Sequence, residues 1–61
     1  MDRMLIAMLR RVSKEKVNTA YFDEYQTDLI DTLRSYGFVD KNVIGDVAIT
    51  DAGIKELKEY E

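Results

Sequence analysis

The fold of this chain is decided by two strings, Leu33-Arg34-Ser35-Tyr36-Gly37-Phe38-Val39-Asp40 and Val47-Ala48-Ile49-Thr50-Asp51-Ala52-Gly53. The first string predicts a helix that ends at Gly37, because glycine readily adopts the left-handed conformation found after many helices. Extended backbone is then expected at 38–39. In the second string Val47 and Ile49 alternate with their neighbours, as in a half-buried strand. Together the strings predict a helix followed by two short strands.

The segments beside these strings predict a hairpin turn and a C-terminal helix. Asn42 and Gly45 bracket the turn between the two extended runs. Thr50 is the expected N-cap of the last helix, and Asp51 occupies its positive first turn. The buried face of this helix is expected from Ile54, Leu57 and Tyr60.

The N-terminal segment, residues 1–16, has the periodicity of an amphipathic helix. At about 100° per residue its apolar residues fall on one arc. They are Met1, Met4, Leu5, Met8, Leu9 and Val12. Four basic residues cluster on the opposite side, namely Arg3, Arg10, Arg11 and Lys14.

The middle of the chain is expected to hold two helices. Asn18 or Thr19 is a candidate N-cap for a short helix that reaches Tyr25. Thr27 is a candidate N-cap for a third helix that ends at Tyr36. One continuous helix in place of these two is the alternative, and the two capping signals favour two helices.

These elements give a mainly helical α+β fold with a small β-hairpin, in the order helix, helix, helix, hairpin, helix. The order and the two strings resemble the winged helix-turn-helix family, in which an apolar-x-x-x-Gly-apolar-apolar-acid run leads into the first wing strand. The string 47–53 is similar to the family's second wing strand followed by a Thr-acid-x-Gly helix start. The strings cover residues 33–57, and the upstream helices resemble the family by order alone. The resemblance implies a single winged-helix domain over 1–61, with a recognition helix at about 27–36 and a wing at 38–50.

The resemblance also implies a small DNA-binding transcriptional regulator. In family members that bind DNA, the recognition helix enters the major groove and the wing approaches the backbone or the minor groove. The residues carried over as DNA contacts are Thr27, Thr32, Arg34, Ser35, Lys41 and Asn42, with Arg3, Arg10, Arg11 and Lys14 as auxiliary phosphate contacts. Arg34 is the one residue of the expected recognition helix able to make a bidentate contact with guanine.

The charge of the expected recognition helix favours a different partner. Residues 19–33 carry four acids and no base, and acids that face the groove repel phosphate. The alternative function is protein-protein interaction without DNA binding, through an acidic docking face of Asp23, Glu24, Asp28 and Asp31. Such a face suits a basic partner protein, and small accessory proteins of phages and mobile elements often look like this. The alternative is a purely structural role for these acids, since Asp28 and Asp31 favour a helix start and Asp31 can pair with Arg34.

The size of the chain predicts self-association. A chain of 61 residues buries only about 60% of the surface that its unfolded form exposes. Cysteine and histidine are absent, so neither disulfides nor the usual zinc ligands are present to stabilise the core. We expect a homodimer with contacts from the first helix, at Met1, Met4, Leu5 and Met8. The basic side of that helix can alternatively pair with the acidic 19–33 region of a second subunit.

Composition also bears on chemistry and location. The net charge is −3, divided into +3 over residues 1–18 and −6 over 19–61. Glu24 and Asp28 have no companion nucleophile and no phosphate-binding glycine loop, so we expect no enzyme activity, no cofactor and no metal site. No apolar run approaches the roughly 20 residues that cross a membrane, and a cytoplasmic protein is expected. Most aromatic side chains are expected in the core, among Tyr21, Phe22, Tyr25, Tyr36, Phe38 and Tyr60.

Overall fold

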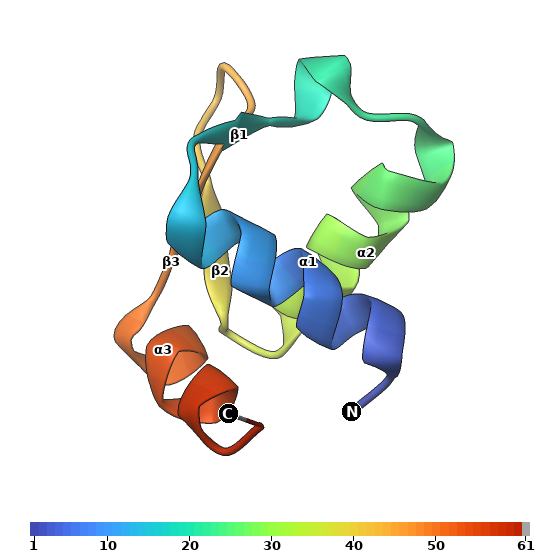
Figure 1. The fold of residues 1–61 in the computed structure, drawn as a ribbon. Helices are drawn as coiled ribbons and strands as arrows, with labels where there is room; N and C mark the ends of the chain where they lie inside the picture. Colours follow the sequence, from blue (N-terminus) through green and yellow to red (C-terminus); the bar gives the residue numbers. More distant parts are fainter. Residues whose placement is uncertain (61) are drawn as a thin grey trace.

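The structure, a computed structural model, describes residues 1–60 as three α-helices, one turn of 3-10 helix and a small antiparallel sheet (Figure 1). This is an α+β fold. The sheet has the strand order β1-β3-β2, so β3 is the central strand and pairs with both neighbours. In chain order the elements are α1 (Arg3–Lys14), β1 (Val17–Asn18), η1 (Thr19–Tyr21), α2 (Glu24–Ser35), β2 (Val39–Lys41), β3 (Asp46–Ile49) and α3 (Asp51–Lys58).

The core lies where α1, α2 and the inner face of the sheet meet. Leu9, Ile30 and Leu33 are fully buried there, and Val39 is almost so. The remaining core residues are Leu5, Met8, Val12, Val17, Val47 and Leu57. The amphipathic N-terminal helix is thereby confirmed, and it begins after Asp2, whose carboxylate accepts a 2.7 Å hydrogen bond from the Met4 amide.

The prediction of two helices in the middle of the chain is wrong. Only one turn of 3-10 helix follows β1, with the Asn18 side chain accepting from the Ala20 amide. Asp23, and not Thr27, is the N-cap of α2. Its carboxylate accepts from the Gln26 amide at 2.9 Å, while the Gln26 side chain accepts from the Asp23 amide at 3.2 Å. This reciprocal capping box satisfies two helix-end amides, which a single threonine at the next turn does not match.

Strand β1 was not expected from the sequence, since two residues are too few to show a period. It is formed because Val17 lies opposite Val47 and points into the core. The Asn18 side-chain amide donates to the Ile44 carbonyl at 2.9 Å and to the Asp46 carboxylate at 2.8 Å. The predicted hairpin is therefore the outer part of a three-stranded sheet.

The junction between α2 and α3 joins the two strings that decided the expected fold. Gly37 has φ of +81° and ends α2, with its amide donating to the Arg34 carbonyl and the Phe38 amide donating to the Leu33 carbonyl. Across the sheet, the Thr50 hydroxyl donates to the Gly37 carbonyl at 2.7 Å. The Thr50 amide also donates to the Phe38 carbonyl at 3.0 Å. The helix stop at Gly37 and the start of α3 after Thr50 are thus confirmed, and these hydrogen bonds join the two sites.

Close packing around Gly53 shows why the second string has a glycine at this position. The Thr50 hydroxyl accepts from the Gly53 amide at 3.0 Å, which caps α3. Gly53 is buried so closely against the Phe38 carbonyl that a Cβ would overlap this oxygen. The buried side of α3 is accordingly made by Gly53 and Leu57. The expected burial of Ile54 and Tyr60 is wrong, because both are about 41% exposed.

The prediction that most aromatic side chains lie in the core is wrong for the four tyrosines. Tyr21, Tyr25, Tyr36 and Tyr60 are all exposed, whereas Phe22 and Phe38 are half-buried against the core. The difference between tyrosine and phenylalanine is due to the phenol hydroxyl, which keeps its hydrogen bonds when it stays in water. Several large aromatic surfaces are therefore available for contacts.

Candidate interaction surface

The exposed side of α2 is a line of acidic residues. Glu24, Asp28 and Asp31 follow each other at spacings of four and three residues, so they share one side of the helix. That side lies opposite Ile30 and Leu33, which are in the core. We call Glu24, Asp28 and Asp31 the acidic line.

Asp23, the fourth residue of the predicted docking face, has a different task. Its carboxylate caps α2 through the bond to the Gln26 amide. The capping oxygen is therefore committed to the helix start, where negative charge is favourable. Asp23 remains exposed beside the acidic line, but it belongs to the helix end.

Asp31 also joins α2 to the wing, which is β2, β3 and the turn between them. Its Oδ1 lies 3.9 Å from Arg34 Nη1 and 4.0 Å from Lys41 Nζ. The predicted pair between Asp31 and Arg34 is thus present, and Lys41 adds a second cation from another element. About half of the Asp31 side chain is exposed, so each pair is weak and open to exchange with a ligand.

The hydroxyl residues proposed as DNA contacts are used by α2 itself. The hydroxyls of Thr27, Thr32 and Ser35 donate to helix carbonyls at 3.0, 2.9 and 2.6 Å. Thr27 lies two turns before Arg34 and shares its side of the helix. Thr32 follows Leu29 by one turn and therefore lies on the side that packs against α1. The predicted set is split between two sides of α2.

The wing turn is held by Asn42 and ends in apolar side chains. The Asn42 side-chain oxygen accepts from the amides of Ile44 and Asp46 at 3.1 and 2.9 Å, and Gly45 completes the turn with φ of +92°. Val43 is fully exposed at the tip and Ile44 is largely exposed. Asn42, a predicted DNA contact, thus has its acceptor committed to the turn.

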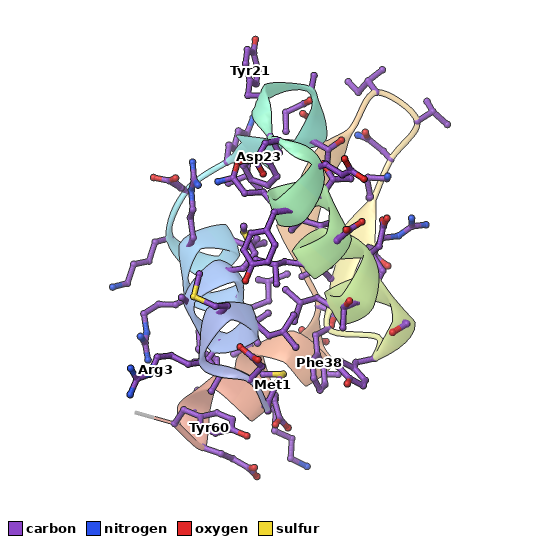
Figure 2. The ribbon with its side chains drawn as sticks, turned by 90° about the vertical axis from the view of Figure 1, so that its right-hand side faces the viewer. Met1, Arg3, Tyr21, Asp23, Phe38 and Tyr60 are labelled. Carbon is purple, nitrogen blue, oxygen red and sulfur yellow. The ribbon has the colours of Figure 1, made fainter. Side chains whose placement is uncertain are left out.

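The basic residues of α1 form a separate group. Arg3, Arg10 and Lys14 follow at seven and four residues and share one side of α1. Figure 2 shows Arg3 pointing away from α2, so this basic row lies apart from Arg34 and Lys41. Arg11 is engaged within the fold: its Nε lies 2.7 Å from Glu15 Oε1, and its guanidinium carbon lies 5.2 Å from the centre of the Phe22 ring.

The predicted dimerisation set also divides. Leu5 and Met8 are only 8% and 6% exposed because they fill the core of the single chain, so little of either side chain is left for the predicted dimer contact. Met1 and Met4 are exposed and available. The periodicity of apolar residues identifies the apolar side of a helix, but it does not show which of these residues lie at the exposed edge of that side.

In residues 1–60 no group of three or more acidic side chains is placed to hold a metal ion, and no buried side-chain polar atom lacks a hydrogen-bond partner. None of the helices formed by these residues is long and apolar enough to cross a membrane. No family model, curated protein or solved structure matches the chain.

Proposed function

We propose that this chain is a non-catalytic winged-helix domain that docks a basic partner protein on the acidic line of α2. The run from α2 through the β2–β3 hairpin to α3 favours the winged-helix assignment, and one turn of 3-10 helix stands where the second helix was expected. In this assignment η1 and α2 correspond to the turn and the recognition helix, and β2 and β3 form the wing. A scaffold of this kind does not define its ligand, so the partner is inferred from side chains.

The observation that carries the docking proposal is the arrangement around Asp31. The exposed side of α2 presents three carboxylates, and the two nearest cations, Arg34 and Lys41, both share the Asp31 oxygen. A polyanion would have to displace Asp31 from both cations and approach Glu24 and Asp28. A cationic protein surface meets no such obstacle, because it gains pairs with carboxylates that point to solvent.

The partner should present lysine or arginine side chains beside an apolar patch. The apolar component follows from Tyr21, Val43 and Ile44, which are strongly exposed. Tyr21 and the wing turn lie at the end of the molecule where α2 begins (Figures 1 and 2). Exposed apolar side chains next to a charged line are typical of a protein contact, in which the apolar part supplies most of the affinity and the charges supply specificity.

An amide NMR titration tests this proposal. The probe is a synthetic amphipathic peptide with lysines on one side and leucines on the other. We expect salt-sensitive shifts centred on residues 24–31, and their loss in the double variant Asp28→Lys with Asp31→Lys. The matched control is Asp40→Lys with Glu59→Lys, which changes the net charge equally at exposed sites away from the acidic line. Equal binding by both double variants would contradict the proposal.

DNA binding is the second candidate, favoured by one specific observation. Arg34 on α2 and Lys41 on the wing come within 4.0 Å of one carboxylate oxygen. They belong to the two elements that contact DNA in winged-helix proteins. If DNA is the ligand, Arg34→Ala weakens binding to some sequences more than to others, while Lys41→Ala weakens binding to every sequence and lowers the salt slope by about 1. A duplex that produces no shifts at low salt would contradict this candidate.

A further inference from the structure

One face of the molecule, formed by α1 and α2, carries an apolar surface that the proposed function does not use. A groove of about 200 Å³ runs between the two helices and is lined by Met4, Ala7, Met8, Arg11, Gln26 and Leu29. The helices are antiparallel, since Met1 lies beside Tyr36 at one end and Arg11 lies over Phe22 at the other. Figure 2 shows this face, with α1 and α2 next to each other. We call it the α1–α2 face.

The exposed apolar area of this face is large for so small a chain. Met4 is 45% exposed, and Tyr25 and Tyr36 are 55% and 56% exposed. A second hollow, of about 260 Å³, lies at the Met1 end of the face and is lined by Met1, Tyr36, Phe38 and Glu56 of α3. Tyr36 and Phe38 contact each other, with ring centres 5.6 Å apart. Exposed apolar side chains gathered on one face are typical of a contact with another macromolecule.

The two edges of the face carry opposite charges. Arg3 and Lys14 follow the outer side of α1, whereas Asp28 and Glu24 follow the outer side of α2. Among residues 1–60, Lys14, Glu24 and Asp28 form no ion pair. The face is therefore bordered by base on one side and acid on the other, with apolar side chains between.

We propose that the occupant of this face is a second copy of the chain, related by a two-fold axis parallel to the helices. Such an axis places α1 of each copy against α2 of the other. Lys14 of one copy then lies near Glu24 of the other, at the end of the face where Arg11 contacts Phe22, and the same contact recurs on the second edge. A two-fold axis across the helices would place α1 against α1 and α2 against α2, with like charges opposed. The charges of the two edges therefore select the first arrangement.

The same arrangement fits the apolar residues. Met4 and Ala7 of one copy cover Tyr36 and Leu29 of the other, so both copies lose exposed apolar surface at once. A chain of 61 residues has a small core, and burial of this face is a direct way to stabilise it. Leu5 and Met8 are not needed for the contact, because they are already buried in each copy.

Sedimentation equilibrium of the full chain tests the dimer and its axis. We expect a species of twice the 7.1 kDa chain mass at high micromolar concentration. Lys14→Glu should weaken the dimer about ten-fold, because two equivalent pairs become repulsive. Lys14→Glu combined with Glu24→Lys should restore it. Lys55→Glu, at an exposed position of α3, is the matched control with unchanged association.

A second variant separates the apolar contact from the charges. Met4→Lys should dissociate the dimer and leave the fold intact, since Met4 is exposed and contributes little to the core. Thermal unfolding of each variant verifies the fold. A monomer at high micromolar concentration would overturn the proposal, and so would a dimer that tolerates both Met4→Lys and Lys14→Glu. Failure of the double charge exchange to restore association would overturn the proposed axis. Peptide or DNA binding does not enter these measurements, so their result is independent of the proposed function.

Discussion

Replacing Asp31 by Asn changes one charge at the point where α2 meets the wing. The carboxylate oxygen lies 3.9 Å from Arg34 Nη1 and 4.0 Å from Lys41 Nζ, and the amide keeps its shape. The substitution frees both cations for a polyanion and removes one anchor for a polycation. The two candidate functions therefore predict changes of opposite sign from a single variant.

The magnitude follows from two exposed ion pairs. Side-chain exposure is 53% for Asp31, 45% for Arg34 and 26% for Lys41, so solvent screens both pairs. Exposed pairs contribute about 0.2–1 kcal/mol each. Releasing two of them should tighten duplex binding by about 1 kcal/mol, or about five-fold, and removing one contact should weaken a lysine-rich peptide by a similar factor. The fold should lose less than about 1 kcal/mol for the same reason.

Fluorescence anisotropy with a labelled duplex and with the labelled peptide measures both changes at two salt concentrations. Asp40→Asn is the matched control, because Asp40 is exposed, forms no ion pair among residues 1–60, and loses the same charge. A docking function gives weaker peptide binding for Asp31→Asn than for Asp40→Asn. DNA binding gives a tighter duplex complex. If the two variants behave alike with both probes, the α2 surface is not the binding site and the reasoning from Asp31 is refuted.

Two further predictions concern the α2–α3 junction. Gly53→Ala should lower the unfolding free energy by about 1–3 kcal/mol, because its Cβ would overlap the Phe38 carbonyl. Gly37→Ala brings its Cβ against no atom, so it should lower the unfolding free energy by about 1 kcal/mol through the positive φ alone. Thermal denaturation should show the larger fall in Tm for Gly53→Ala, and equal falls would contradict the close packing. Thr50→Val should lower the unfolding free energy by about 1 kcal/mol, because the variant loses the cap of α3 and the hydrogen bond to the Gly37 carbonyl. Thr50→Ser keeps the hydroxyl and both bonds. Denaturant unfolding of the two variants checks this, and equal stability would contradict the two hydrogen bonds.

Local signals in the sequence were sufficient for the strongest elements. The helix stop at Gly37 and the cap at Thr50 were predicted because each depends on one residue and its neighbours. Their mutual hydrogen bond was not predicted, because it joins residues that are far apart in the chain. Strand β1 was not predicted either, because it is a strand only through its pairing with a distant segment, in which Val47 lies opposite Val17.

The start of α2 shows how two local signals compete. Thr27 and Asp23 are both acceptable N-caps by residue type. Asp23 prevails because Gln26 returns a hydrogen bond to it, and the helix then begins early enough to bring Glu24 onto the exposed side. Composition alone did not rank these two caps. The later cap would have left the acidic line one residue shorter.

The candidate surface was predicted in part. A helix period was sufficient for the pair between Asp31 and Arg34, since they lie three residues apart. Lys41 could not be added from sequence, because its approach to Asp31 depends on how the wing packs against α2. The exposed Tyr25 and Tyr36 were also missed, since an aromatic residue in a short sequence is more often in the core than at its edge.

The two proposed contacts meet at Glu24 and Asp28, which form the acidic edge of the α1–α2 face, whereas Asp31 lies toward the wing and stays outside the dimer contact. Ile30 and Leu33 face the core, Tyr25 and Leu29 belong to the α1–α2 face, and the acidic line lies between that face and the wing. In the proposed dimer the two-fold axis turns the acidic lines of the two copies in opposite directions. Each dimer then offers two separate docking sites, one on each side. The same geometry disfavours a single palindromic duplex, because two α2 helices that point away from each other cannot enter successive major grooves on one side of the DNA.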